Sequence, residues 1–181
     1  MKKLLVPLMI SLCLLCGCAD KGEESFEQFT TQLRETDNIS FTADVRAEYA
    51  DKTAEFTLKY TQTGDMARIT VVEPEIIAGL SACVKEGSLQ LEYDGAILDI
   101  GQLTDSDLSP MSALPLITDA LKNAYVDIAW TEDDMIAARL MPDDDTVVTV
   151  RLNSELVPQN AEISYKEKTV VFAEISQWEA S

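Results

Sequence analysis

Histidine is absent from the 181 residues of this chain. Without it the chain cannot build a Ser-His-Asp or Cys-His catalytic arrangement or a histidine-ligated zinc site, and it lacks the usual general base near neutral pH. Glycine is also scarce, with seven residues, and no glycine-rich phosphate-binding loop is present. These absences exclude the commonest hydrolase, zinc-enzyme and nucleotide-binding designs.

Positive charge is scarce as well. Lysine and arginine total 14 against 32 aspartate and glutamate residues, and the formal net charge is −18. Such a surface repels nucleic acid and anionic lipid head groups and favours basic proteins, cationic peptides or divalent cations. Solubility explains the charge equally well. We therefore expect no nucleic-acid partner, and a basic envelope protein is the kind of protein partner that the charge would fit.

The acidic residues gather in short runs at 105–107, 131–134 and 143–145. None of these runs has the ligand spacing and closing glutamate of an EF-hand. Aspartate is favoured in turns because its side chain bonds to the nearby backbone, so solvated turns explain the runs better. No pair of carboxylates stands out for glycoside cleavage. We predict no metal site, no cofactor and no enzymatic activity.

The start of the chain has the layout of an export signal. Lys2 and Lys3 precede an apolar run over 4–15, which is too short for a permanent membrane helix of about 20 residues. The sequence LCGC, which ends at Cys18, resembles the lipobox of bacterial lipoproteins, with an aliphatic residue three places before the modified cysteine and a small residue directly before it. The resemblance implies cleavage after Gly17 and a lipid on Cys18.

The chain then divides into a signal peptide at 1–17, a lipidated tether at 18–24 and one folded domain at 25–181. We expect an extracytoplasmic protein that a lipid on Cys18 anchors to the cell membrane, with an ordinary secretory signal or a membrane anchor as the alternative. The remaining Cys83 would have no disulfide partner, and a lone thiol without a base is typical of a small buried apolar residue.

Helical periodicity marks the beginning of the domain. Phe26, Phe29 and Leu33 recur at helical spacing, and Ser25 with Gln28 fits a capping box. This pattern predicts a first helix over about 25–36.

A second helical segment lies near the middle of the chain. Ser109 and Pro110 fit an N-cap followed by a first-turn proline, and apolar residues continue along one face as far as Ala124. Because Pro115 lies inside this run, we predict a short turn followed by a helix over about 114–124.

Most of the remaining chain alternates between apolar and polar residues, as strands with one wet face do. Residues 39–49 and 54–60 predict a long hairpin, and a third strand at 66–73 stops at Pro74. Short apolar runs continue to residue 175, for about eleven strands in all. Their short connections favour antiparallel order. The predicted fold is α+β: a curved antiparallel half-barrel of about eleven strands, with the N-terminal helix and the mid-chain helical segment on its concave face.

The order of these elements, the sequence EP at 73–74 and the sequence YDG at 93–95 resemble the LolA and LolB lipoprotein carrier superfamily. Gram-positive lipoprotein relatives, such as clostridial spore germination lipoproteins, are the more similar branch. The resemblance covers about residues 25–178 and implies a half-barrel that holds a lipid. Carriers of this superfamily use an inward-facing arginine, and no arginine of this chain could be aligned to that role.

A curved sheet can fill its concave face with its own side chains or leave room for an acyl chain. From the strand parity we expect inward side chains that include Tyr60, Ile128 and Phe172. The candidate cavity residues are Phe41, Phe56, Leu58, Leu91, Met111, Leu114, Ile117, Leu121 and Trp130. Plain core packing is the alternative for each of them.

Two functions follow. In the first, the domain binds a lipid or another amphipathic or hydrophobic ligand without catalysis, at the membrane to which Cys18 tethers it. In the second, it is a non-catalytic interaction module that regulates a cell-envelope or spore-germination partner.

Overall fold

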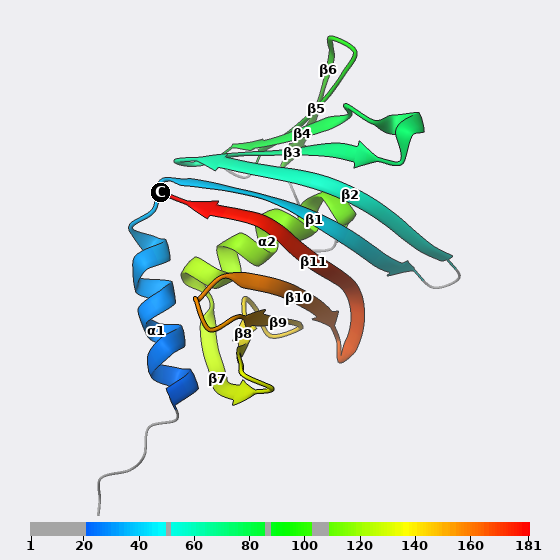
Figure 1. The fold of residues 1–181 in the computed structure, drawn as a ribbon. Helices are drawn as coiled ribbons and strands as arrows, with labels where there is room; N and C mark the ends of the chain where they lie inside the picture. Colours follow the sequence, from blue (N-terminus) through cyan, green and yellow to red (C-terminus); the bar gives the residue numbers. More distant parts are fainter. Residues whose placement is uncertain (1–20, 50–51, 86–87, 103–108) are drawn as a thin grey trace, which may run out of the picture.

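The computed structural model of the chain describes residues 21–49, 52–85, 88–102 and 109–181. These residues form one open antiparallel sheet of eleven strands with two α-helices, which confirms the predicted α+β half-barrel (Figure 1). Cys18 and the expected signal peptide lie outside the described residues. Within the described part of the chain, neither helix has the length and apolar character needed to span a membrane.

The elements follow one another with short connections. The helices are α1 (Lys21–Arg34), the short 3-10 helix η1 (Glu75–Ile77) and α2 (Pro110–Asn123). The strands are β1 (Asn38–Tyr49), β2 (Lys52–Thr63), β3 (Met66–Glu73), β4 (Ser81–Lys85), β5 (Ser88–Tyr93), β6 (Ala96–Gln102), β7 (Tyr125–Glu132), β8 (Met135–Met141), β9 (Thr146–Leu152), β10 (Pro158–Tyr165) and β11 (Lys168–Ala180).

The strand order explains where α2 lies. The order is β6-β5-β4-β3-β2-β1-β11-β10-β9-β8-β7, so the first and last strands pair at the centre of the sheet. Asn38 and Ser181 close this central pair with two backbone hydrogen bonds of 3.0 and 2.9 Å. The two edges, β6 and β7, follow each other in sequence with α2 between them. The helix therefore crosses the open side of the half-barrel and covers its concave face (Figure 1).

The helices cover the concave face of the sheet unevenly. One row of side chains runs across β1 to β6 in register: Phe41, Tyr60, Ile69, Ala82, Leu91 and Leu98. The first four are at most 2% exposed, whereas Leu98 at the β6 edge is 60% exposed. The helices thus bury the concave face near the centre of the sheet and leave it open toward β6.

The first helix begins earlier than predicted. It starts at Lys21 rather than near residue 25, and it ends at Arg34. Ser25 lies inside the helix, so its predicted role as a cap was wrong. Glu23 and Glu24 occupy the first turn, where negative charge interacts favourably with the helix dipole. Residues 21–24, which the sequence assigns to the tether, are therefore helical.

The second helix is continuous, so the predicted interruption at Pro115 was wrong. Ser109 and Ser112 form a reciprocal capping box in which each side-chain oxygen accepts from the other residue's backbone N–H, at 3.2 and 2.8 Å. Leu114 and Ile117, on either side of the proline, are completely buried. The burial of this face offsets the backbone hydrogen bond that Pro115 removes.

All residues of the hydrophobic core lie within the predicted domain. Every residue of the buried cluster lies between Phe26 and Ile175, and α1, α2 and the sheet all contribute to it. A chain that begins at Ala19 retains the whole core, so we expect it to fold without the signal peptide.

Candidate ligand-binding site

An apolar cavity of about 300 Å³ lies on the concave face, between the first turn of α2, the helix η1 and strands β2 to β5. Ala82 lies at its floor, between the larger residues Ile69 and Leu91 of the same row. Its small side chain leaves room there. Its lining is formed by Phe56, Val71, Ile77, Leu80, Ala82, Val84, Leu89, Leu91 and residues 109–112. This volume is at the lower end of the range for small-molecule sites, about 300 to 1,000 Å³.

The structure divides the predicted cavity residues into three groups. Phe56, Leu91 and Met111 line the cavity. A second group is 2% exposed or less and belongs to the packed core: Phe41, Leu58, Leu114, Ile117 and Leu121. The third group is Trp130 alone.

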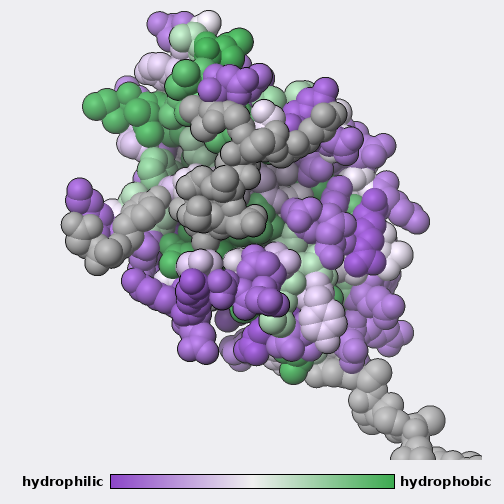
Figure 2. Space-filling view, turned by 180° about the vertical axis from the view of Figure 1, so that it is seen from behind, coloured by the Kyte–Doolittle hydropathy of each residue, from purple (hydrophilic) through white to green (hydrophobic). Residues whose placement is uncertain are grey.

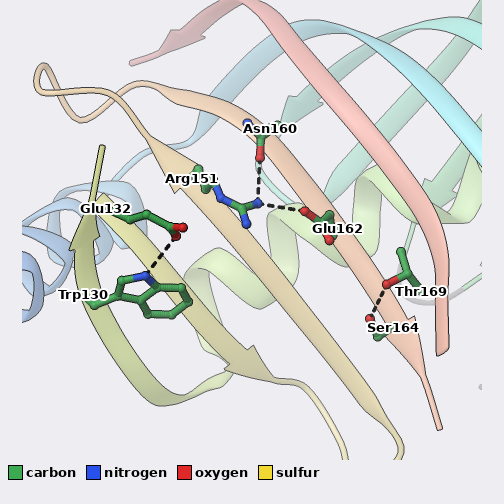
Figure 3. A network of polar contacts seen from close by, with 7 residues as sticks. All are labelled: Trp130, Glu132, Arg151, Asn160, Glu162, Ser164 and Thr169. Atoms are coloured by element: carbon green, nitrogen blue, oxygen red, sulfur yellow. Dashed lines mark hydrogen bonds and ion pairs between the residues drawn. The ribbon is translucent and has the colours of Figure 1, made fainter. Parts of the chain in front are cut away.

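Trp130 does not face the cavity, so its assignment to the concave face was wrong. It pairs in register with Ala137, and its Nε1 donates to the Glu132 carboxylate over 3.2 Å on the face of the sheet away from α2 (Figure 3). A register shift between Val126 and Ile128 inverts the alternation of β7. Strand parity counted from the start of β7 therefore gives the wrong face from Ile128 onward.

Two other expected inward side chains also face outward. Ile128, which follows the same register shift, is 50% exposed. Phe172 lies opposite Arg46 in the β1–β11 pair, and the guanidinium carbon lies 5.6 Å from the centre of its ring. In β11, Val171 and Ala173 are the buried residues that face the core.

A polar groove of about 520 Å³ lies next to the apolar cavity, between the second half of α2, the end of α1 and the β2–β3 turn. Val84 lines both. The other lining residues are Arg34, Thr36, Asp37, Tyr60, Gln62, Gly64, Asp65, Ala67, Pro115, Thr118, Asp119, Lys122 and Asn123. This groove was not predicted, because polar residues from four separate segments form it and none of those segments carries a recognisable motif.

Two cations of the groove already hold its walls together. The Lys122 ammonium donates to the Thr36 carbonyl over 2.9 Å, and Arg34 Nε donates to the Lys122 carbonyl over 2.6 Å. These bonds join the ends of α1 and α2. They fix the width of the groove and satisfy carbonyls that the helix ends leave free.

The hydroxyl of Tyr60 forms part of the groove's inner wall. It donates to Gln62 Oε1 over 3.0 Å, and the residue is 1% exposed. Burial raises the pKa of Tyr60 to about 12; a hydrogen bond with Thr118 acts in the opposite direction, and the charge of Asp119 adds to the rise. The groove therefore presents a neutral phenol throughout the physiological range of pH.

The outer, convex face carries a third hollow, of about 460 Å³, over β1, β2, β11 and the end of β3. Phe172 and Arg46 lie in it together with the carboxylates of Asp44, Glu55, Glu73 and Glu174. Asp44 accepts a hydrogen bond from Thr57 Oγ1 over 2.7 Å and stands directly opposite Glu174 in the β1–β11 register. Among the described residues, no group of three or more acidic or cysteine side chains is arranged to hold a metal ion.

The strand arginines lie on this outer face. Arg151 donates to Glu162 over 2.8 Å and to Asn160 over 3.3 Å (Figure 3). Arg68 pairs with Glu92 at 3.0 Å and Arg139 with Asp127 at 3.4 Å. Neither the apolar cavity nor the polar groove has a strand arginine in its lining, so the inward arginine of the carriers has no counterpart there.

No protein-family model and no curated protein matches the sequence. Several solved structures match the fold. They include an uncharacterized conserved protein from Thermus thermophilus, with a TM-score of 0.51, 7% identity and coverage of 89% of this chain and 88% of the other.

The LolA superfamily protein NE2245 from Nitrosomonas europaea has a TM-score of 0.49, with 12% identity and coverage of 87% and 93%. One chain in the structure of the complex between the CwlD amidase from Clostridioides difficile and the GerS lipoprotein has a TM-score of 0.44, with 15% identity and coverage of 86% and 92%. At these identities the likeness concerns the fold alone.

Proposed function

We propose that this chain is an extracytoplasmic lipoprotein, held at the cell membrane through a lipid on Cys18, that binds a lipid or another hydrophobic ligand without altering it chemically. The observation that carries the proposal is the apolar cavity beneath the first turn of α2. The resemblance of the sequence to the LolA and LolB superfamily supports it, although a shared fold alone does not transfer function.

The energetics of the cavity favour an occupant. The cavity is partly open, so its apolar lining contacts water instead of packed side chains, which costs free energy in proportion to the apolar area. Apolar side chains also remain exposed at the same end of the sheet: Ile97 is 69% and Leu98 is 60% exposed, and apolar groups gather over this end in Figure 2. An acyl chain in the cavity would restore the missing contacts.

Filling the cavity tests the proposal. Ala82→Leu would place a larger side chain on its floor, and Cys83→Leu is the matched control because Cys83 points to the other face of the same strand. Residues 19–181 of each variant are purified, extracted with organic solvent and analysed by mass spectrometry for bound lipid. We expect stoichiometric lipid in the wild type and Cys83→Leu, and a loss of at least about tenfold in Ala82→Leu.

Thermal unfolding of all three proteins shows whether they remain folded. Lipid-free wild-type protein that also fails to take up both added fatty acid and added monoacylglycerol would overturn the proposal. Equal lipid content in Ala82→Leu would show that any bound lipid lies elsewhere.

The outer hollow favours a second function, that of a non-catalytic interaction module that regulates a basic envelope or spore-germination protein. Its carboxylates Glu55, Glu73 and Glu174 have no ion-pair or hydrogen-bond partner among the described residues, and Phe172 offers an apolar contact beside them. The same preparations discriminate between the two functions. This second function requires a complex from envelope extract that Ala82→Leu retains and that salt weakens.

A further inference from the structure

We infer that the apolar cavity and the polar groove form one trough, and that its ligand is a single-chain amphiphile with an uncharged, hydroxyl-bearing head. This inference rests on the proposed function and names the class of ligand that the site selects. The apolar chain would lie under Met111, and the head would lie against the part of α2 between Pro115 and Lys122.

One face of α2 runs along both compartments. Met111 lines the apolar cavity, whereas Pro115, Thr118 and Lys122 line the polar groove. These residues are spaced by four, three and four positions, which places them on a single stripe of the helix. On the opposite wall Val84 lines both compartments, so the two adjoin at this residue.

The two compartments differ in chemistry. The cavity is lined by aliphatic and aromatic side chains, apart from the serines of the α2 cap at its mouth. In the groove, neutral groups from Thr36, Gln62 and Asn123 accompany charges of both signs. A ligand that fills both compartments is therefore amphipathic. The apolar volume of about 300 Å³ suits one short chain rather than the paired chains of a diacyl lipid.

Charge in the groove disfavours a charged head. Three carboxylates, Asp37, Asp65 and Asp119, outnumber the two cations, Arg34 and Lys122, and both cations already bind backbone carbonyls. An anionic head would meet this acidic lining and the −18 charge of the whole chain. A cationic head would meet Arg34 and Lys122 in the same lining. Neutral hydroxyls avoid both penalties and can pair with donors and acceptors alike.

Pro115 adds a specific acceptor where the compartments meet. Proline has no N–H, so the carbonyl of Met111 lacks the hydrogen bond that residue i+4 normally donates in a helix. Met111 and Pro115 both line the trough, so this carbonyl lies on the same stripe between the apolar and polar parts. A carboxylate or a quaternary ammonium cannot donate to it, whereas a hydroxyl can.

The test compares three probes with the same ten-carbon chain: monodecanoylglycerol, decanoate and decyltrimethylammonium. Each is titrated calorimetrically, below its critical micelle concentration, into delipidated residues 19–181. We expect the glyceride to bind about tenfold more tightly than either charged probe, which is the size of effect that one well-made hydrogen bond supplies. Pro115→Ala restores the N–H at position 115, and we expect it to weaken glyceride binding about two- to tenfold while decanoate binding stays the same.

Pro142→Ala is the matched control, because this proline lies in the β8–β9 turn and lines neither compartment. Equal or tighter binding of a charged probe overturns the head-group inference, yet the proposed function stands if Ala82→Leu abolishes that binding. A loss in Pro115→Ala that is the same for all three probes overturns the role of the Met111 carbonyl. If none of the three probes binds the wild type, the proposed function fails as well.

Discussion

At the scale of single residues, the buried phenol of Tyr60 makes stability depend on pH in a defined direction. Its pKa is about 12 in the folded protein against an ordinary value of 10.0, chiefly because of burial. The unfolded chain therefore loses this proton first, so the contribution to folding is complete below pH 10 and is lost as the pH rises toward 12. At about 1.4 kcal/mol per pH unit, the loss amounts to about 2 to 3 kcal/mol.

We therefore expect Tyr60→Phe to flatten the fall in unfolding free energy above pH 10. Near neutral pH the variant should be less stable by about 1 kcal/mol, because the bond to Gln62 is lost. Urea unfolding at pH 8, 10 and 11 measures both effects. Tyr125→Phe is the control, since Tyr125 is 70% exposed and should leave the pH profile unchanged. If the unfolding free energy of Tyr60→Phe falls above pH 10 as steeply as that of the wild type, the fall does not come from the Tyr60 phenol.

At the scale of elements, Gly22 allows α1 to lie close against β7. A Cβ at this position would stand 2.6 Å from the backbone carbonyl carbon of Trp130 and 2.9 Å from its Cα. Backbone cannot move aside as a flexible side chain can. We expect Gly22→Ala to lower the unfolding free energy by about 1 to 3 kcal/mol, although alanine favours a helix by about 1 kcal/mol.

Chemical denaturation with urea measures the change in Gly22→Ala. Glu27→Ala, at an exposed position of the same helix, is the comparison and should stay within about 0.5 kcal/mol of the wild type. A stabilised Gly22→Ala protein would mean that α1 does not pack against β7 in this way.

Strand alternation explains how far the fold was predictable. In β1 the apolar and polar residues alternate without interruption, and the buried positions Phe41, Ala43 and Val45 match the prediction. In β11 the run of Val170, Val171 and Phe172 has apolar residues on both faces, so parity is ambiguous. In β7 a register shift inverts the parity before Trp130. Such irregularities depend on pairing with neighbouring strands, which a single sequence does not reveal.

The candidate site was predictable only in its apolar half. Hydrophobic periodicity identified Phe56, Leu91 and Met111, but a periodic pattern cannot distinguish a cavity wall from packed core. Leu58 and Leu114 show this, since they follow the same pattern and are completely buried. The polar groove depends on α2 crossing from one sheet edge to the other, which is a property of the strand order.

At the scale of the whole molecule, the open end of the trough and the start of α1 lie far apart. The chain enters through α1, at the opposite end of the molecule from β6 (Figure 1). On the proposed anchoring, only two residues separate Cys18 from Lys21, and the three chain steps span about 10 Å at most. The exposed apolar end near β6 would then point away from the point of anchoring, so the protein would present its ligand outward.

The net charge of −18 should also govern how salt affects the stability of the protein. On the outer face, two carboxylates lie close enough to repel each other directly. Asp44 and Glu174 are directly opposite in register, an arrangement in which like charges are destabilising. We expect Glu174→Gln to raise the unfolding free energy by about 0.2 to 1 kcal/mol at low salt. Because the Debye length falls to about 3 Å at 1 M salt, the gain should disappear there, and the wild type should itself become more stable as NaCl is added. Glu35→Gln, an exposed change of equal charge at the end of α1, separates the local effect from the global one in thermal and urea unfolding. If both variants gain equally, the net charge rather than the opposed pair is responsible.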